Sequence, residues 1–497
     1  MSALPPLAHW EALAAAFSPR TRALIDGQWR DGSEPPLSAV NPATGKTLAE
    51  VASCSAADID LAVAAARRSF EAGVWSRMPR RERKRRLLRL AELVRTHTEE
   101  LALTETLDMG KPIADAMAFD LPETATTYAW YAEAIDKQYD EIAPTDADSL
   151  ATITREPLGV VGAVVPWNYP LLMASWKLAP ALAAGNSVVL KPAEQSSLSA
   201  LRLAELALEA DIPPGVLNVT PGTGPVAGQA LGLHMDVDCL AFTGSTATGK
   251  RFMQYSGQSN LKQVWLECGG KSPHIVFDDC PDLDRAALAA AIGIFNNQGE
   301  VCIAGSRLYV QAGIYDAFMA KLEAHARAMQ PGNPLDPATA MGAIVDERQL
   351  ARVLQYVESG RREGARLRLG GGRVRWESGG YYVEPTIFEC AAPDLTIVRE
   401  EIFGPVLAVT RFEREEDAVA QANRSPYGLG SGLWTADLSR AHRVSRQLRA
   451  GLVWVNCYFD GDISVPFGGV KQSGFGRDKS LHALDKYTSL KSTWFKL

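Results

Sequence analysis

The feature that most constrains the fold is a regular alternation of short apolar runs and helical patterns, which begins about a third of the way along the chain. Residues 160–165 form an uninterrupted apolar run that ends at Pro166, as expected of a strand buried on both faces. A helical pattern follows at 171–184, and a second apolar strand at 187–190. This order predicts β-α-β units, a parallel sheet and right-handed crossovers.

A second series of the same kind follows residue 302. We expect strands at 307–310 and 451–456, with helices at 315–329 and 346–363 between them. The fold class is therefore α/β, with a second α/β domain after the first.

Four segments lie outside these two series. Residues 56–72 and 81–107 have the pattern of amphipathic helices. Residues 140–155 and 487–497 resemble strands but have no obvious place in either sheet.

Composition excludes several classes of protein. The chain has 497 residues and a net charge of −7, whereas nucleic-acid binders are normally basic. No stretch approaches the ~18 uncharged apolar residues of a membrane span. The seven cysteines show no CxxC pairing, which favours free thiols in a reducing compartment, the cytoplasm, over disulfides or a metal site.

Cys302 is the candidate nucleophile, because it follows the flexible turn Gln298-Gly299. Glu267 lies beside the pair Gly269-Gly270 and is a candidate base. The alternative for the thiol is that it is a small buried hydrophobic residue, as most lone cysteines are.

Two glycine-rich segments resemble nucleotide-binding loops imperfectly. Residues 222–228 have one residue too many for GxGxxG. Residues 244–250 nearly complete a P-loop, but Arg251 stands where a Ser or Thr would bind magnesium, which disfavours a P-loop nucleotide-binding protein. A helix that starts at Ser245 would still bind a phosphate through backbone N–H groups.

Lys191 and Glu194 directly follow a predicted strand, at the sheet edge where open α/β folds bind ligands. A carboxylate there accepts hydrogen bonds from ribose hydroxyls and repels a 2′-phosphate. The alternative is that both are surface loop charges.

Seven motifs together are similar to those of the aldehyde dehydrogenase superfamily, in the family's order and over nearly the whole chain. The motifs are Pro166-Trp167-Asn168-Tyr169-Pro170, Lys191-Pro192-Ala193-Glu194, Phe242-Thr243-Gly244-Ser245-Thr246, Glu267-Cys268-Gly269-Gly270-Lys271, Gln298-Gly299-Glu300-Val301-Cys302, Glu401-Ile402-Phe403-Gly404-Pro405 and Pro466-Phe467-Gly468-Gly469.

The resemblance implies an NAD(P)-dependent enzyme that oxidises an aldehyde to the carboxylic acid. Cys302 would form a thiohemiacetal and then a thioester, Asn168 and the Cys302 N–H would hold the oxyanion, and Glu267 would activate water. The implied cofactor is NAD, with NADP possible. Its implied binding residues are Trp167, Lys191, Glu194, Gly224, Gly228, Ser245, Glu401 and Phe403.

The resemblance also implies a Rossmann-type cofactor domain (1–135 and 156–267), a catalytic α/β domain (268–481) and a small β arm (136–155 and 482–497). The arm would join subunits into a homodimer or homotetramer. Two positions depart from the family pattern. Cys268 stands in place of Leu, with core packing as its expected role, and Asp478 stands in place of Glu, which makes a second-base role doubtful.

Substrate choice is predicted from the segments that the resemblance places at the aldehyde tunnel. An acidic and aromatic mouth would suit an ω-amino or ω-guanidino aldehyde; solvated surface charge is the competing interpretation. The predicted residues are Asp120, Glu123, Trp176, Asp460, Asp462 and Phe467. The run 479–488 is similar to that of bacterial γ-glutamyl-γ-aminobutyraldehyde and guanidinobutyraldehyde dehydrogenases.

Two rivals share the resemblance. A CoA-acylating semialdehyde dehydrogenase does not need a general base at position 267, so Glu267 favours hydrolysis. A non-enzymatic member of the fold would not need Cys302, Glu267 and Asn168 together.

Overall fold

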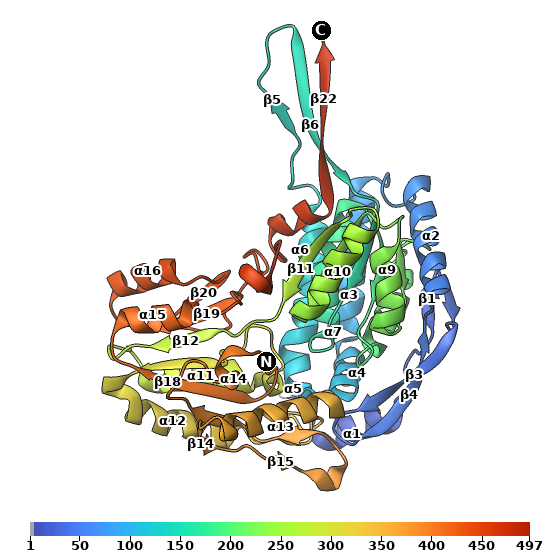
Figure 1. Cartoon of the computed structure of the whole chain (residues 1–497). Coiled ribbons are helices and arrows are strands. Elements are labelled where there is room, and N and C mark those ends of the chain that lie inside the picture. Colours follow the sequence, from blue (N-terminus) through green and yellow to red (C-terminus); the bar gives the residue numbers. More distant parts are fainter. Residues whose placement is uncertain (1–3) are drawn as a thin grey trace.

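The computed structural model describes residues 4–497 and contains two large mixed sheets and a projecting β arm (Figure 1). The first sheet has the order β2-β1-β9-β8-β7-β10-β11-β21, and its five central strands are parallel. Its strands are β1 (Ala23–Ile25), β2 (Gln28–Arg30), β7 (Val160–Val164), β8 (Ser187–Lys191), β9 (Leu217–Val219), β10 (Cys239–Gly244), β11 (Gln263–Cys268) and β21 (Gly474–Phe475).

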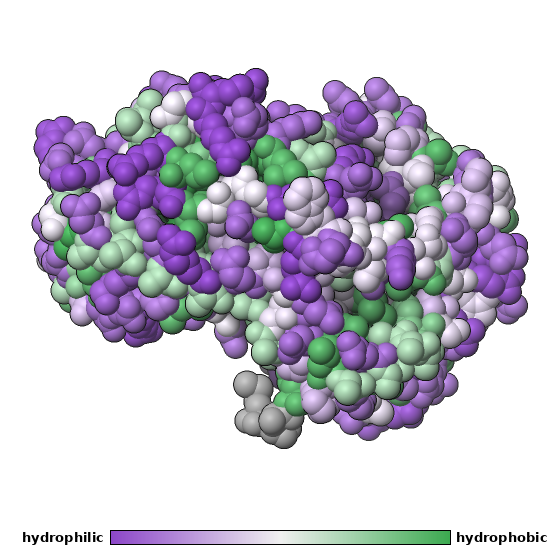
Figure 2. All heavy atoms as spheres, turned by 90° about the horizontal axis from the view of Figure 1, so that it is seen from below, coloured by the Kyte–Doolittle hydropathy of each residue, from purple (hydrophilic) through white to green (hydrophobic). Residues whose placement is uncertain are grey.

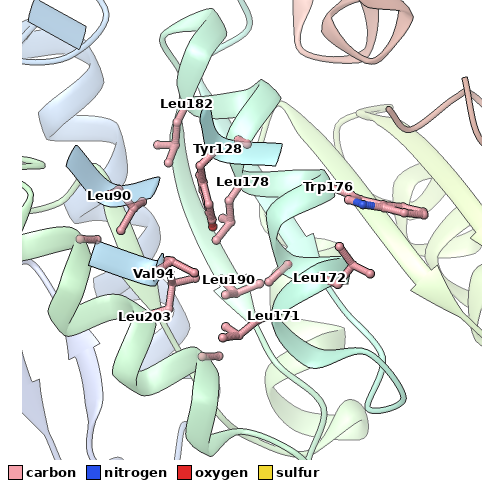
Figure 3. Packing of buried hydrophobic residues seen from close by; sticks show 14 of the residues in the cluster. Leu90, Val94, Tyr128, Leu171, Leu172, Trp176, Leu178, Leu182, Leu190 and Leu203 are labelled. Atoms are coloured by element: carbon pink, nitrogen blue, oxygen red, sulfur yellow. The ribbon is translucent and has the colours of Figure 1, made fainter. Parts of the chain in front are cut away.

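Helices cover both faces of this sheet, which explains why its central strands are apolar throughout. Leu190 on β8 packs into the cluster shared with α3, α6, α7 and α8, and Figure 3 shows this leucine-rich layer. Its neighbour Val189 packs into the opposite layer, with α2, α9 and α10, because successive side chains of a strand point to opposite faces. The helices are α2 (Ala56–Ala72), α3 (Arg80–Thr96), α4 (Thr98–Met109), α6 (Leu121–Ala134), α7 (Pro170–Ala184), α8 (Leu198–Glu209), α9 (Gln229–Leu233) and α10 (Thr246–Gln258).

The second sheet has the order β14-β17-β18-β13-β12-β19-β20 and is parallel except for its edge strand β14. Its strands are β12 (Pro273–Val276), β13 (Arg307–Gln311), β14 (Arg366–Leu369), β17 (Thr386–Glu389), β18 (Val406–Phe412), β19 (Gly430–Trp434) and β20 (Leu452–Val455). Its helices are α11 (Leu283–Phe295), α12 (Tyr315–Ala328), α13 (Glu347–Arg362), α14 (Thr396–Arg399), α15 (Glu415–Asn423) and α16 (Leu438–Gln447). The predicted domain boundary, between residues 267 and 268, falls at the last residue of β11, and the division into domains stays a prediction.

The two segments that the sequence left without a sheet pair with each other. β22 (Thr488–Lys496) runs antiparallel to β6 (Ser149–Pro157), and β5 (Glu141–Ala143) pairs with the other edge of β6. Figure 1 shows this arm extending away from the body. Both segments are therefore strands, as expected, and the role of the arm in joining subunits stays a prediction.

Smaller elements complete the chain: α1 (Leu7–Ala15), the hairpin β3 (Glu34–Asn41) and β4 (Lys46–Ser53), α5 (Ile113–Asp115), and the two-stranded sheet β15 (Arg373–Val374) and β16 (Tyr382–Val383). Short 3-10 and π turns are η1 (Ala116–Asp120), η2 (Gly224–Gly228), η3 (Asn296–Gly299), η4 (Ala312–Ile314), η5 (Trp376–Ser378), η6 (Lys471–Ser473) and η7 (Leu481–Lys486).

One predicted helix is wrong in its extent. The helix expected over 81–107 is two helices, α3 and α4, separated at His97, whose φ of −100° and ψ of 19° leave the helical region. In contrast, α2 has the predicted bounds, because Ser55 and Asp58 form a capping box at its start and Gly73 ends it with a φ of 75°.

The described chain, residues 4–497, contains no helix with the length and apolarity needed to cross a bilayer. Figure 2 shows one face of the molecule, on which hydrophilic residues surround separate hydrophobic patches. Scattered apolar side chains of this kind are ordinary on a protein surface.

Candidate active site

Cys302 is positioned by a sharply turned loop that follows α11. Asn297, Gln298 and Gly299 have successive φ values of 47°, 56° and 71°, all in the left-handed region. Gly299 is required there, because an added Cβ would collide with the backbone of Gly404. The Gln298 side chain accepts a hydrogen bond of 2.9 Å from the Gly342 N–H and so holds the turn in place.

The turn places Cys302 between two cavities. The larger cavity, of about 620 Å³, is lined by the C-terminal ends of β7, β8, β10 and β11 and by α13. The smaller, of about 330 Å³, is mostly apolar and is lined by α7, the η1 turn and the loop after β20. Cys302 and Met173 line both cavities. The two cavities therefore meet at Cys302.

Glu267 stands at the end of β11, on the wall of the larger cavity. It is buried, and both carboxylate oxygens lack a hydrogen-bond partner among residues 4–497. Burial raises the pKa of Glu267 to about 8. A carboxyl group with such a pKa is suited to accept a proton near neutral pH.

A second carboxyl group, Glu401, lies over the glycine pair that follows β11. Its Oε1 atom accepts a hydrogen bond of 3.0 Å from the Gly270 N–H, and burial raises its pKa to about 7. Gly269 must lack a side chain, because an added Cβ would overlap the Glu401 carboxylate. Burial, with further contributions from Glu267 and Glu401, raises the pKa of the Cys302 thiol well above its ordinary range. The thiol therefore needs a nearby base before it can act as a nucleophile.

Two hydrogen bonds fix Asn168 beside the segment that carries Cys302. Its Nδ2 atom donates to the Glu300 carbonyl at 2.8 Å, and its own carbonyl accepts from Asn297 Nδ2 at 3.2 Å. An amide nitrogen carries two hydrogens, so one N–H remains for a ligand. Asn168 lies on the wall of the larger cavity, as Cys302 does.

The structure brings all eight predicted cofactor residues to the wall of the larger cavity. These are Trp167, Lys191, Glu194, Gly224, Gly228, Ser245, Glu401 and Phe403. Their roles stay predictions, because only their placement is given by the fold.

The walls of this cavity fit a dinucleotide. Ser245 caps α10 by accepting a hydrogen bond of 3.3 Å from the Thr248 N–H, so the positive end of a 13-residue helix faces the cavity. Gly224 leaves open space, since an added Cβ would meet only Glu194 within 4 Å. Glu194 itself accepts a hydrogen bond from the Gly224 N–H, which fixes its carboxylate at the cavity wall. At the other end, the rings of Trp167 and Phe403 meet edge to face at 5.3 Å.

The smaller cavity has the aromatic wall that was predicted. Trp176 and Phe467 line it with ring centroids 4.8 Å apart, and Figure 3 shows Trp176 projecting from α7 away from the leucine cluster. Asp460 lies on the same wall and is exposed, and its carbonyl accepts a hydrogen bond of 2.7 Å from the Trp454 indole.

Two of the four acidic residues expected at the tunnel, Asp120 and Asp460, line the smaller cavity, and the other two do not. Asp120 is fully buried on that wall and paired with Lys111, which lines the same cavity, so its negative charge is compensated. Glu123 and Asp462 do not line the cavity, and Asp462 instead accepts a hydrogen bond of 2.8 Å from the Ser464 N–H. Of the four, only Asp460 is an exposed acid on the cavity wall.

Asp478 lies in a buried cluster beneath Glu267. Lys177 and Lys486 both donate hydrogen bonds to its carboxylate. Burial opposes its ionisation, but the two lysines lower the pKa of Asp478 below its ordinary value. A carboxylate held in this way is a poor proton acceptor, which fits the doubt about a second-base role. Cys268 packs in the core, where an added Cβ on Gly249 would lie 3.0 Å from its sulfur.

The comparison with protein families matches residues 29–493 to the model described as the aldehyde dehydrogenase family. The chain belongs to the aldehyde dehydrogenase family.

Three similar proteins show the level of sequence identity within the family. The chain is 54% identical over 492 residues to the NADP/NAD-dependent aldehyde dehydrogenase PuuC of Escherichia coli (strain K12), covering 99% of each chain. It is 50% identical over 488 residues to an aminoacetaldehyde dehydrogenase of Pseudomonas aeruginosa, covering 98% of each. The crystal structure of γ-glutamyl-γ-aminobutyraldehyde dehydrogenase from Burkholderia cenocepacia J2315 superposes with a TM-score of 0.98 at 59% identity, covering 99% of this chain and 100% of that one.

Within this aldehyde dehydrogenase, sequence reasoning missed the contribution of α13. Gln349 donates a hydrogen bond of 2.7 Å to the Phe403 carbonyl, and Arg352 donates one of 2.9 Å to the Glu401 carbonyl. Both also line the larger cavity, together with Arg348. No motif marked them, because their contribution depends on a helix packing against a loop about fifty residues away.

No group of three or more His, Cys, Asp or Glu side chains that could hold a metal ion occurs between residues 4 and 497.

Proposed function

We propose that this protein oxidises an aldehyde that carries an amino or guanidino group to the carboxylic acid, with NAD(P) in the larger cavity. The observation that carries this proposal is the position of Cys302 on the walls of both cavities. An aldehyde in the smaller cavity and a cofactor in the larger one would meet at its sulfur atom.

The first step would be attack of the Cys302 thiolate on the aldehyde carbon, which gives a thiohemiacetal. Glu267 is the candidate acceptor for the thiol proton, because each of the two groups shifts the pKa of the other. The free N–H of Asn168 and the backbone N–H of Cys302 would donate to the oxyanion. When bound, the cofactor supplies a nicotinamide ring that accepts the hydride and leaves a thioester on Cys302.

Glu267 would then take a proton from the water that hydrolyses the thioester. Its burial and its free carboxylate oxygens support this role. The same observation disfavours a CoA-acylating enzyme, in which a thiol would replace water, and a purely structural protein. Arg251 on the wall of the larger cavity likewise disfavours a P-loop that binds magnesium.

The choice of an amino or guanidino aldehyde rests on three supports. The smaller cavity is lined by aromatic side chains that suit a methylene chain or a cation, and Asp460 stands exposed at its wall. The relatives named for aminoacetaldehyde and for γ-glutamyl-γ-aminobutyraldehyde act on nitrogen-containing aldehydes.

The test is NADH formation with a panel of charged and uncharged aldehydes, with and without CoA. Cys302→Ala should abolish NADH formation and still bind NAD, as measured by calorimetry. Cys280→Ala is the matched control, because Cys280 lies outside both cavities, in the loop that precedes α11. Turnover of Cys302→Ala close to that of the wild type would refute the proposal.

We also propose a cytoplasmic homodimer or homotetramer joined through the arm. All seven cysteines are free, and Leu490, Trp494 and Phe495 on β22 are exposed apolar side chains. Light scattering coupled to size-exclusion chromatography, before and after removal of residues 488–497, tests the assembly.

A further inference from the structure

Lys479 lies on the wall of the aldehyde cavity, and no step described so far uses it. Its Nζ atom stands 5.7 Å from the centroid of the Trp176 ring. It also lies beside the loop after β20, because a Cβ added to Gly461 would be 3.7 Å from it. The ammonium group is therefore part of the tunnel wall, beside the residue that follows the exposed Asp460.

This ammonium group has no ion-pair partner. Within residues 4–497 no carboxylate lies within 4.0 Å of Lys479 Nζ, whereas the other lysine of the cavity wall, Lys111, is paired with the buried Asp120. Partial burial lowers the pKa of Lys479, and the more distant carboxylates of Glu123 and Asp462 favour its charged form. A half-buried cation with no direct partner can bind an anionic group that enters the tunnel.

The backbone holds Lys479 in an unusual conformation. Lys479 and Ser480 have φ values of 60° and 52°, which residues with a Cβ rarely adopt in succession. Asp478 and Phe467 exchange two backbone hydrogen bonds of 2.7 Å on one side. On the other side, the Ser480 N–H donates to the Ile463 carbonyl at 2.7 Å. These backbone hydrogen bonds on both sides of Lys479 fix the direction of its side chain before a substrate binds.

We propose that Lys479 is a specificity-determining residue that binds a carboxylate at the far end of the aldehyde substrate. Asp460, on the same wall, would bind an ammonium group beside that carboxylate. The tunnel would then prefer aldehydes whose far end resembles a free amino acid over aldehydes that carry an amine alone. This proposal rests on the proposed function, because it requires the aldehyde carbon to be at Cys302.

The groups that line the tunnel support this substrate class. The Cys302 thiol and the rings of Trp176 and Phe467 share the wall with Lys479 and Asp460, which supply opposite charges. A simple amine would meet Asp460 but would also be repelled by Lys479. A zwitterionic end satisfies both charges, and γ-glutamyl-γ-aminobutyraldehyde, for which the solved relative is named, has such an end.

The test compares four aldehydes that share an acyl-γ-aminobutyraldehyde body. The acyl group is γ-glutamyl (both charges), 4-aminobutyryl (amine only), glutaryl (carboxylate only) or butyryl (neither). The kcat/KM values are measured for the wild type, Lys479→Met and Lys479→Arg. Lys321→Met on α12 is the control, since Lys321 pairs with Asp284 at the surface and lies outside both cavities.

Lys479→Met should lower the preference for γ-glutamyl over 4-aminobutyryl by about 10- to 100-fold, the usual effect of losing a hydrogen bond to a charged group. The loss should appear in KM, kcat/KM for the 4-aminobutyryl compound should rise, and Lys479→Arg should restore most of the preference. An unchanged ratio, or an equal loss with all four aldehydes, would overturn the role of Lys479. Failure of the wild type to oxidise any of the four would instead overturn the proposed function, and this proposal with it.

Discussion

Gly269→Ala is a small change that should damage cofactor binding much more than it damages the fold. A Cβ at this position would lie well under 3.0 Å from both oxygens of Glu401, closer than real Cβ atoms approach. The backbone tolerates alanine, because Gly269 is not among the residues with positive φ. The Glu401 side chain must therefore move, and it can swing into the cavity that it lines.

The expected magnitude follows from what Glu401 would lose. Its hydrogen bond of 3.0 Å from Gly270 would break, and the carboxylate would leave the position from which it is expected to bind the cofactor. A hydrogen bond to a charged group contributes about 1.5–3 kcal/mol, which is roughly a 10- to 150-fold increase in the KM for NAD. The melting temperature should fall by no more than about 4 °C, because the displaced atoms belong to the end of a flexible side chain.

Steady-state kinetics with NAD as the varied substrate, and calorimetry of NAD binding, measure the effect. Gly257→Ala on α10 is the matched control, since its added Cβ would meet nothing within 4 Å. The double variant Gly269→Ala/Glu401→Ala should be little worse than Glu401→Ala, because both changes remove the same interaction. Near-normal NAD affinity in Gly269→Ala, or additive losses in the double variant, would refute this reasoning.

Three further changes address the base, the cofactor preference and the tunnel charge. Since burial raises the pKa of Glu267 to about 8, its carboxylate form increases as pH rises, so thioester hydrolysis should accelerate from pH 7 to 9; Glu267→Gln should abolish this rise, and a rise that persists would count against the base. Glu194→Gln should reduce the kcat/KM preference for NAD over NADP by roughly tenfold, since a ribose hydrogen bond and the repulsion of a 2′-phosphate are both lost; an unaltered ratio would exclude that role. Asp460→Asn should weaken the dependence of kcat/KM on salt for ammonium-bearing aldehydes, and an identical dependence would leave Asp460 as an ordinary surface acid.

Local patterns predicted the elements and much of the site. The bounds of α2 follow from its caps, Ser55 and Gly73, which are local in sequence. The rule that open sheets bind ligands at strand ends placed Lys191 and Glu194 correctly on the wall of one cavity.

What the sequence could not show depends on contacts between distant or irregular segments. Asp120 was expected to make the tunnel mouth negative, because its spacing to Glu123 does not reveal that it is buried in an ion pair with Lys111. The break at His97 has no glycine or proline to mark it. Lys479 was not predicted to line the tunnel, because it lies in a loop whose left-handed backbone follows no periodic pattern.

The two cavities share only Met173 and Cys302 among their lining residues. Substitutions on one wall therefore leave the other almost untouched. Related enzymes can therefore come to accept different aldehydes through substitutions near Trp176, Asp460 and Lys479, while the residues of the larger cavity stay the same. Cys302 is the reactive residue common to both cavities, so the lining of either cavity can change without a change at the nucleophile.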